Sequence, residues 1–242
     1  MDFGRTKKKV ASRALAAPSV GRLRIRWGRT DSRRMLSHLD NMRVIENAIK
    51  ESGFPVAFSQ GTHPRMKLSF CPPLPMGFTT EAEYVDISLE QNCTGPMIDN
   101  IRKALPDGFL MLEAKTVFAK SMSLSEAINR VTYTFKLVNG TDVEKLKNNI
   151  TELLKRGQIE ITRKMKSGES VVDIRQAIFK LDVSHDELAM TLGIGSGGYA
   201  RPTEVAQILF GLNEEETAAL QFHRREMFRE TDDNRRIEGI EL

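Results

Sequence analysis

Hydrophobic and polar positions along the chain follow two periods, and the switches between them predict its elements. In RLRIRWGR (22–29), three apolar residues fall on one face of a strand and three arginines fall on the other. From Ser37 the apolar positions take helical spacing, which continues until Gly53. The pattern therefore predicts a strand with one basic face, followed by a helix.

The remaining pattern gives each half of the chain the same order of elements. In the first half, further strands are expected at 54–59, 66–70, 83–90 and 109–118, with a helix at 95–106. In the second half, strands are expected at 131–138, 158–166, 171–183, 185–195 and 217–228, with helices at 141–157 and 202–212. Both orders fit the βαββαβ arrangement of ferredoxin-like folds. We therefore predict an α+β protein with two ferredoxin-like halves in tandem, which meet near residue 125.

The length of 242 residues supports this division, because single domains usually have about 100–150 residues. The predicted boundaries are a disordered basic arm at 1–19, a first ferredoxin-like domain at 20–124, a second at 125–230, and a flexible tail at 231–242.

Charge is distributed unevenly along the chain. Residues 1–34 contain 11 of the 36 lysines and arginines but two of the 32 carboxylates, so the remainder is mildly acidic. A basic end on an acidic body is typical of a protein that contacts a polyanion, with nucleic acid as the first candidate. A solvated arm that keeps the protein soluble would have the same composition.

The sequence predicts neither export nor membrane insertion. It has no uninterrupted apolar run of the roughly 18 residues that a membrane span needs, and residues 1–20 lack the apolar core of a secretory signal. We therefore expect a cytoplasmic protein. Its two cysteines, Cys71 and Cys93, are interpreted as reduced thiols.

No self-contained catalytic or cofactor motif is present. The glycines of LGIGSGGYARP lack the Lys-Ser/Thr of a phosphate-binding loop and the spacing of a dinucleotide site. Two cysteines and four scattered histidines do not give the spacing of a zinc site or the thiolates of an iron–sulfur cluster. We therefore predict no metal, no cofactor and no catalytic residue of the chain's own.

Several polar residues are candidates for binding a substrate, and each also has a structural interpretation. His38 and Asp40 stand at the start of a predicted helix, where they either cap and pack or bind substrate. Asp173 and Arg175 share a strand face and favour a structural ion pair. Arg201 precedes a helix N-terminus, a position that binds anions or points into solvent. The basic face of the strand at 22–29 adds Arg24 and Arg26. The turn at 59–67 adds Ser59, His63, Arg65 and Lys67.

The segment from Ser37 to Tyr84 resembles the radical-SAM-linked protein family, a family of unknown function. The residues that carry the resemblance are Ser37, His38, Leu39, Asp40, Pro55, Ser59, Gly61, Pro64, Leu74, Gly77, Glu83 and Tyr84, with weaker likeness in VVDIRQAI and ARPTEV. The chain departs from the family at 46–50, where members carry a run of arginines, and at the 61–65 turn.

This resemblance implies a protein encoded beside, or fused to, a radical SAM protein and acting in RNA metabolism. The partner would carry the cluster, and this chain would bind the substrate. The predicted arrangement is also similar to the tandem ferredoxin-like folds of CRISPR repeat-processing endoribonucleases. Two alternatives therefore stay open: a metal-independent ribonuclease that uses His38 or His63 as general acid or base, and a non-catalytic assembly factor.

Overall fold

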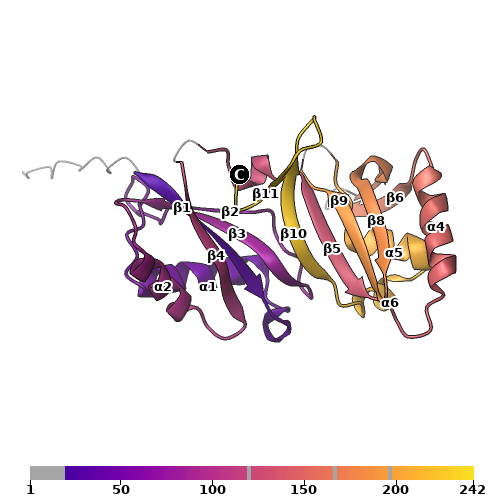
Figure 1. Cartoon of the computed structure of the whole chain (residues 1–242), viewed down its shortest axis with the longest axis horizontal. Helices are drawn as coiled ribbons and strands as arrows, with labels where there is room; N and C mark the ends of the chain where they lie inside the picture. The colour runs from indigo at the N-terminus through magenta and orange to yellow at the C-terminus, as the bar shows by residue number, and fades with distance from the viewer. Residues whose placement is uncertain (1–19, 119–120, 166–167, 196–197) are drawn as a thin grey trace, which may run out of the picture.

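The computed structural model describes residues 20–118, 121–165, 168–195 and 198–242 (Figure 1). The predicted basic arm at 1–19 lies outside these residues. The strands are β1 (Gly21–Arg29), β2 (Leu68–Phe70), β3 (Thr79–Leu89), β4 (Phe109–Val117), β5 (Arg130–Lys136), β6 (Glu160–Met165), β7 (Gly168–Asp173), β8 (Ile178–Ser184), β9 (Glu187–Gly193), β10 (His223–Glu230) and β11 (Arg236–Glu238). The helices are α1 (His38–Glu51), α2 (Gly95–Ala104), α3 (Leu124–Ala127), α4 (Val143–Lys155), α5 (Pro202–Phe210) and α6 (Glu214–Ala218), with 3₁₀ turns η1 (Asp31–Arg33) and η2 (Arg175–Ala177).

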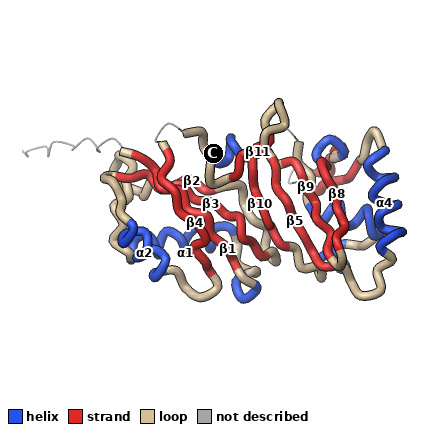
Figure 2. Tube along the Cα trace, viewed as in Figure 1, coloured by secondary structure: helices blue, strands red, loops and turns tan. Residues whose placement is uncertain are grey.

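The prediction of an α+β protein is confirmed. Within the described residues, nine strands form one sheet whose main path is β4-β1-β3-β10-β5-β9-β8 (Figure 2). Strand β2 pairs with β3, and β11 pairs with β10. The pairing is antiparallel everywhere except between β3 and β10.

Each half of the sheet has the same internal order. In the first half, β4-β1-β3-β2 is the order 4-1-3-2 when the strands are numbered along the chain. In the second half, β10-β5-β9-β8 repeats that order, with α4 and α5 in the connections. The hairpin of β6 and β7 stands apart as a two-stranded sheet.

One predicted strand, 171–183, is interrupted. Residues 171–173 form the end of β7, and residues 178–183 belong to β8, with η2 between the two strands. The break arises because Asp173 Oδ1 accepts the backbone N–H groups of Ile159 and Arg175, at 2.8 and 2.9 Å. Ile174 is thereby turned into the core, where it is fully buried. The expected strand at 54–59 is also reduced, to two isolated bridges at Val56 and Phe58.

Two hydrophobic clusters hold the sheet to its helices. The first joins β1, β3 and β4 to α1 and α2 through residues such as Leu23, Ile49 and Ile101. The second joins β5, β8 and β9 to α4 and α5. Residues from the first half also belong to this second cluster: Cys71, Leu74, Phe78, Ala82 and Tyr84. The halves therefore share a core as well as a sheet.

The segment 231–242 is packed, whereas its sequence predicts a flexible tail. Strand β11 pairs with β10, and Ile240 is buried. Gly239 lies directly against Tyr84, where an added Cβ would come within 2.6 Å of the ring. Because the side chain of a glycine takes no space, the chain end can close over the sheet at this point.

None of the helices in the described part of the chain is both long and apolar enough to cross a membrane.

A candidate substrate cleft at the junction of the halves

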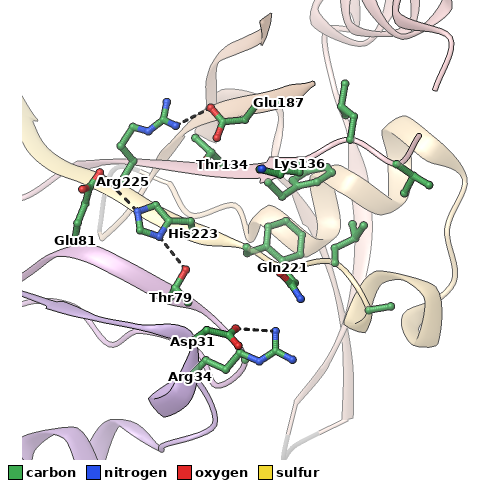
Figure 3. A pocket seen from close by; sticks show the side chains of 17 residues that line it. Asp31, Arg34, Thr79, Glu81, Thr134, Lys136, Glu187, Gln221, His223 and Arg225 are labelled. Atoms are coloured by element: carbon green, nitrogen blue, oxygen red, sulfur yellow. Dashed lines mark hydrogen bonds and ion pairs between the residues drawn. The ribbon is translucent and has the colours of Figure 1, made fainter. Parts of the chain in front are cut away.

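Strands β3 and β10 pair in the sheet at two positions, and a cleft opens beside this parallel junction. The pairs are His223 with Thr79 and Arg224 with Thr80. The cleft has a volume of about 460 Å³ and is lined by η1 and β3 from the first half and by β5, β10 and residues 219–222 from the second (Figure 3). The parallel junction thus places side chains that are far apart in sequence around one cavity.

His223 lies at the centre of this cleft. Its Nδ1 is 2.8 Å from Thr79 Oγ1, and its Nε2 is 3.6 Å from Glu81 Oε1 (Figure 3). Thr79 is itself fixed, because its backbone N–H donates to Phe222 O at 3.1 Å. A hydroxyl, an imidazole and a carboxylate therefore lie in sequence, with the hydroxyl hydrogen-bonded to the ring and the carboxylate just beyond hydrogen-bond distance of it.

The charges of the cleft are balanced. Arg34 pairs with Asp31 at 3.3 Å, and Arg225 pairs with Glu187 at 2.6 Å. Lys136 also lines the cleft and has no ion-pair partner among the residues that the structure describes. The cations Arg34, Lys136 and Arg225 face the carboxylates Asp31, Glu81 and Glu187.

A buried polar cluster connects the halves next to the cleft. Arg224 Nη1 donates to Glu83 Oε1 at 2.9 Å, and its Nη2 donates to Tyr133 Oη at 2.9 Å. Burial alone would lower the pKa of Arg224, but Glu83, Tyr133 and Cys71 together outweigh burial, so the pKa is raised. Burial raises the pKa of the Cys71 thiol, whose Sγ lies 3.5 Å from Glu83 Oε2. This cluster keeps Arg224 charged and the thiol protonated, and it fixes β10 against β3.

Arg29 organises the first-half wall of the junction. It is almost fully buried, and its guanidinium donates to the carbonyls of Leu36, Pro75 and Phe78 at 2.6–3.1 Å. Its Nε has no hydrogen-bond partner among the described residues. Burial lowers the pKa of Arg29 from its ordinary value.

Arg24 and Arg26, which the sequence predicts to face a groove together, differ in their exposure to solvent. Arg24 is fully buried, with Nε and Nη2 donating to Asp86 at 2.6 and 2.8 Å. Its Nη1 donates to the carbonyls of Gly239 and Leu242. Arg24 is therefore inaccessible to substrate, because the chain end covers it. Arg26 is half-buried, and its Nε donates to Glu81 O at 2.7 Å.

His38 and Asp40 lie at the start of α1, as predicted. The Ser37 hydroxyl accepts from Asp40 N, and the Asp40 carboxylate accepts from Ser37 N and Oγ, which forms a capping box. These hydrogen bonds hold the pKa of Asp40 below its usual range. His38 packs edge-on against Phe70, and burial lowers its pKa. This geometry corresponds to the capping interpretation.

The predicted binding turn forms an exposed loop outside the cleft. Ser59 Oγ accepts the backbone N–H of Arg65, so the hydroxyl closes the loop. His63, Arg65 and Lys67 are exposed on it. None of these three side chains has a hydrogen bond or ion pair to another described residue.

Arg175 and Arg201 have different surroundings. Arg175 donates to the carbonyls of Leu154, Arg156 and Ile178, so it closes the C-terminal end of α4 and makes no ion pair with Asp173 among the described residues. Arg201 precedes α5, is about half exposed, and lies beside a second groove at the junction.

The sequence pattern does not predict the residues that line the cleft. Thr79, Lys136, His223 and Arg225 stand at strand ends, where their polarity predicts only a change of element. The run His223-Arg224-Arg225 was the available signal, since three consecutive basic residues include both faces of a strand.

Metal coordination has no candidate among the described residues. They include no group of three or more His, Cys, Asp or Glu side chains placed to hold an ion. Both cysteines are free thiols, with Cys71 buried and Cys93 half-buried.

Solved structures similar to the chain include an unknown protein from Galdieria sulphuraria, with 12% identity over 86% of this chain and 98% of that one, and a TM-score of 0.25. They also include the first two RRM domains of yeast poly(U)-binding protein (Pub1), with 11% identity over 84% and 98%, and a TM-score of 0.20.

None of the curated proteins matches the chain. A family model described as an uncharacterized protein conserved in bacteria (DUF2344) matches residues 22–202, which include β3 of the parallel junction and end before β10. The match spans most of the sequence, and the chain therefore belongs to this family of uncharacterized bacterial proteins.

Proposed function

We propose that this protein is an accessory substrate-binding partner of a radical SAM enzyme in the cytoplasm, and that it binds RNA in the junction cleft. The observation that carries the proposal is the convergence of both halves on that cleft. Thr79 and Arg34 come from the first half, and Lys136, His223 and Arg225 come from the second. A cavity that needs both halves to form is suited to hold a substrate in a fixed orientation.

The ion pairs of the cleft are compatible with exchange for phosphate. The side chains of Arg34 and Asp31 are 33% and 72% exposed, and those of Arg225 and Glu187 are 40% and 29% exposed. Ion pairs this exposed contribute little to stability, so a phosphate can replace the carboxylate at small cost. Arg34, Lys136 and Arg225 then supply up to three phosphate contacts.

The fold and the sequence resemblance support the other parts of the proposal. The order 4-1-3-2 in both halves of the sheet supports tandem ferredoxin-like halves. The link to a radical SAM enzyme rests on the resemblance of residues 37–84, and assigns the chemistry to the partner.

The salt dependence of RNA affinity tests the cleft directly. Each phosphate contact to single-stranded RNA contributes about 0.7 to the slope of log affinity against log salt concentration. Three contacts in the cleft therefore predict a decrease with a slope of about 2. Lys136→Gln and Arg225→Gln should each reduce that slope by about 0.7, measured by fluorescence polarisation with a labelled single-stranded RNA. Arg156→Gln, on an exposed residue outside the cleft, should leave it unchanged. Affinity that is insensitive to both cleft variants would exclude this site.

Partner binding is tested separately by co-purification of this chain with a radical SAM protein. A partner complex that is insensitive to salt and has no RNA affinity would favour the assembly-factor alternative.

One observation favours a second function, metal-independent cleavage of RNA. His223, rather than His38 or His63, faces the cleft together with Thr79 and Lys136. In that function His223 would act as the general base on a ribose hydroxyl. RNA cleavage by the purified chain in EDTA that is lost in His223→Ala would establish it, and the absence of cleavage would leave the binding function.

A further inference from the structure

A second groove lies beside the substrate cleft, across residues 217–222. It has a volume of about 570 Å³ and shares five residues with the cleft: Arg34, Gly77, Ala219, Leu220 and Phe222. Its walls again come from both halves, residues 75–78 on one side and residues 199–203 on the other.

Each wall is held in place by an arginine behind it. On the first-half side, Arg29 binds the carbonyls of Pro75 and Phe78. On the second-half side, Arg163 Nη2 donates to Tyr199 O at 2.8 Å and forms two hydrogen bonds of 2.8 Å with the Glu204 carboxylate. Two separately anchored walls give a groove whose shape exists before anything binds, which lowers the entropy lost on binding.

The lining of the groove is apolar with two cations. The apolar part includes two methionines with large exposed fractions, Met35 (64%) and Met76 (56%). Among the described residues, Arg34 and Arg201 are the charged side chains that line it, and the nearest carboxylate to Arg34 is its ion-pair partner Asp31, outside the groove lining. The one carboxylate near Arg201, Glu204, lies 3.7 Å away and is already engaged by Arg163.

We propose that this groove docks an acidic amphipathic helix of a partner protein. The apolar face of the helix would pack on Met35 and Met76, and its carboxylates would pair with Arg34 and Arg201. Exposed methionines suit such helices, because the flexible thioether adapts to different apolar side chains. RNA fits this groove less well, since its affinity comes from many phosphate contacts and two arginines offer only two. The inference rests on the proposed function insofar as the partner is the radical SAM protein.

Synthetic peptides test the groove without that partner. The probe is a fluorescent peptide of about 18 residues, long enough for partial helicity, with Leu and Met on one face and Glu on the other. The matched controls carry Lys in place of Glu, or the same composition in scrambled order. The acidic peptide should bind, and the lysine and scrambled peptides should bind at least about tenfold more weakly.

Variants of the intact protein locate the binding. Met76→Asp and Arg201→Glu should each weaken the acidic peptide about tenfold or more, whereas Arg156→Glu should not change its affinity. Far-UV circular dichroism confirms that each variant is folded. Equal affinity for acidic and basic peptides, or unchanged affinity in Met76→Asp, would each overturn the proposal.

The outcome is separable from that of the proposed function. Loss of peptide binding in Met76→Asp with RNA affinity intact supports the groove, whether or not RNA binds in the cleft. RNA binding that depends on Lys136, combined with no peptide binding, would keep the proposed function and reject the groove.

Discussion

At the scale of single residues, the arginines of β1 show what a local pattern can and cannot specify. Period-two alternation predicts correctly that Arg24 and Arg26 share a face of the strand. It does not predict that Arg24 is buried, because its partners Asp86 and Gly239 lie 62 and 215 residues further along the chain. A basic residue becomes a core residue only when the fold brings such partners to it.

The buried pair of Arg24 and Asp86 should be far more important for stability than an exposed pair. Asp86→Asn leaves a buried guanidinium without its counter-charge, and should lower the free energy of unfolding by about 3–5 kcal/mol. Asp99→Asn removes the exposed partner of Arg102 and should lower it by about 0.2–1 kcal/mol. Urea unfolding of both variants gives the comparison, and equal losses would contradict the assigned burial of Arg24.

His38 should make stability depend on pH. Its folded pKa is lowered by burial, so the unfolded chain binds the proton more readily. Its contribution is therefore complete above the unfolded value of about 6.5 and is lost as the pH falls through the folded value. Melting temperatures at pH 7.5 and 5.5 should differ less for His38→Gln than for the parent protein. His63→Gln, in an exposed loop, is the control, and an unchanged difference in His38→Gln would show that His38 is not desolvated.

At the scale of elements, the sequence predicts helices and strands where local chemistry determines them. The Ser37 cap and the Gly53 end of α1 are local signals, and the structure has both. The strand expected at 171–183 is interrupted because its break depends on side-chain contacts to Ile159 and to the end of α4. The run itself contains no glycine or proline that would indicate a break.

The docking of the chain end on Tyr84 should require glycine at position 239. Gly239→Ala places a methyl group within 2.6 Å of the Tyr84 ring and 3.0 Å of Met227 O, and should destabilise the protein by about 1–3 kcal/mol. Gly157→Ala meets nothing within 4 Å, and should stabilise it by about 0.4–1 kcal/mol through the unfolded state. Similar effects of both substitutions on denaturant unfolding would indicate that the chain end is not docked there.

At the scale of the whole molecule, the junction explains why the fold class was predictable and the cleft was not. Each half follows from local periodicity and the order of its elements. The cleft arises from a parallel pairing of β3 with β10, whose paired residues Thr79 and His223 are 144 positions apart. No periodicity within either half specifies that contact, so Lys136, His223 and Arg225 had no signal that linked them to Thr79.

The shared sheet and shared second cluster predict that the two halves unfold together. Trp27 is the single tryptophan and is buried in the first cluster, so its fluorescence reports on the first half, whereas far-UV circular dichroism reports on the whole chain. Leu188 is fully buried in the second cluster, and Leu188→Ala should lower stability by about 2–5 kcal/mol. If the halves are coupled through Phe78, Tyr84 and the β3–β10 junction, this substitution should shift the urea midpoint of Trp27 fluorescence as much as that of circular dichroism.

Val171→Ala, at an exposed position of β7, should shift neither midpoint. A Trp27 midpoint that stays in place while the dichroism transition splits in two would mean that the halves are independent domains, and a cleft formed between independent domains would not be preorganised for its substrate.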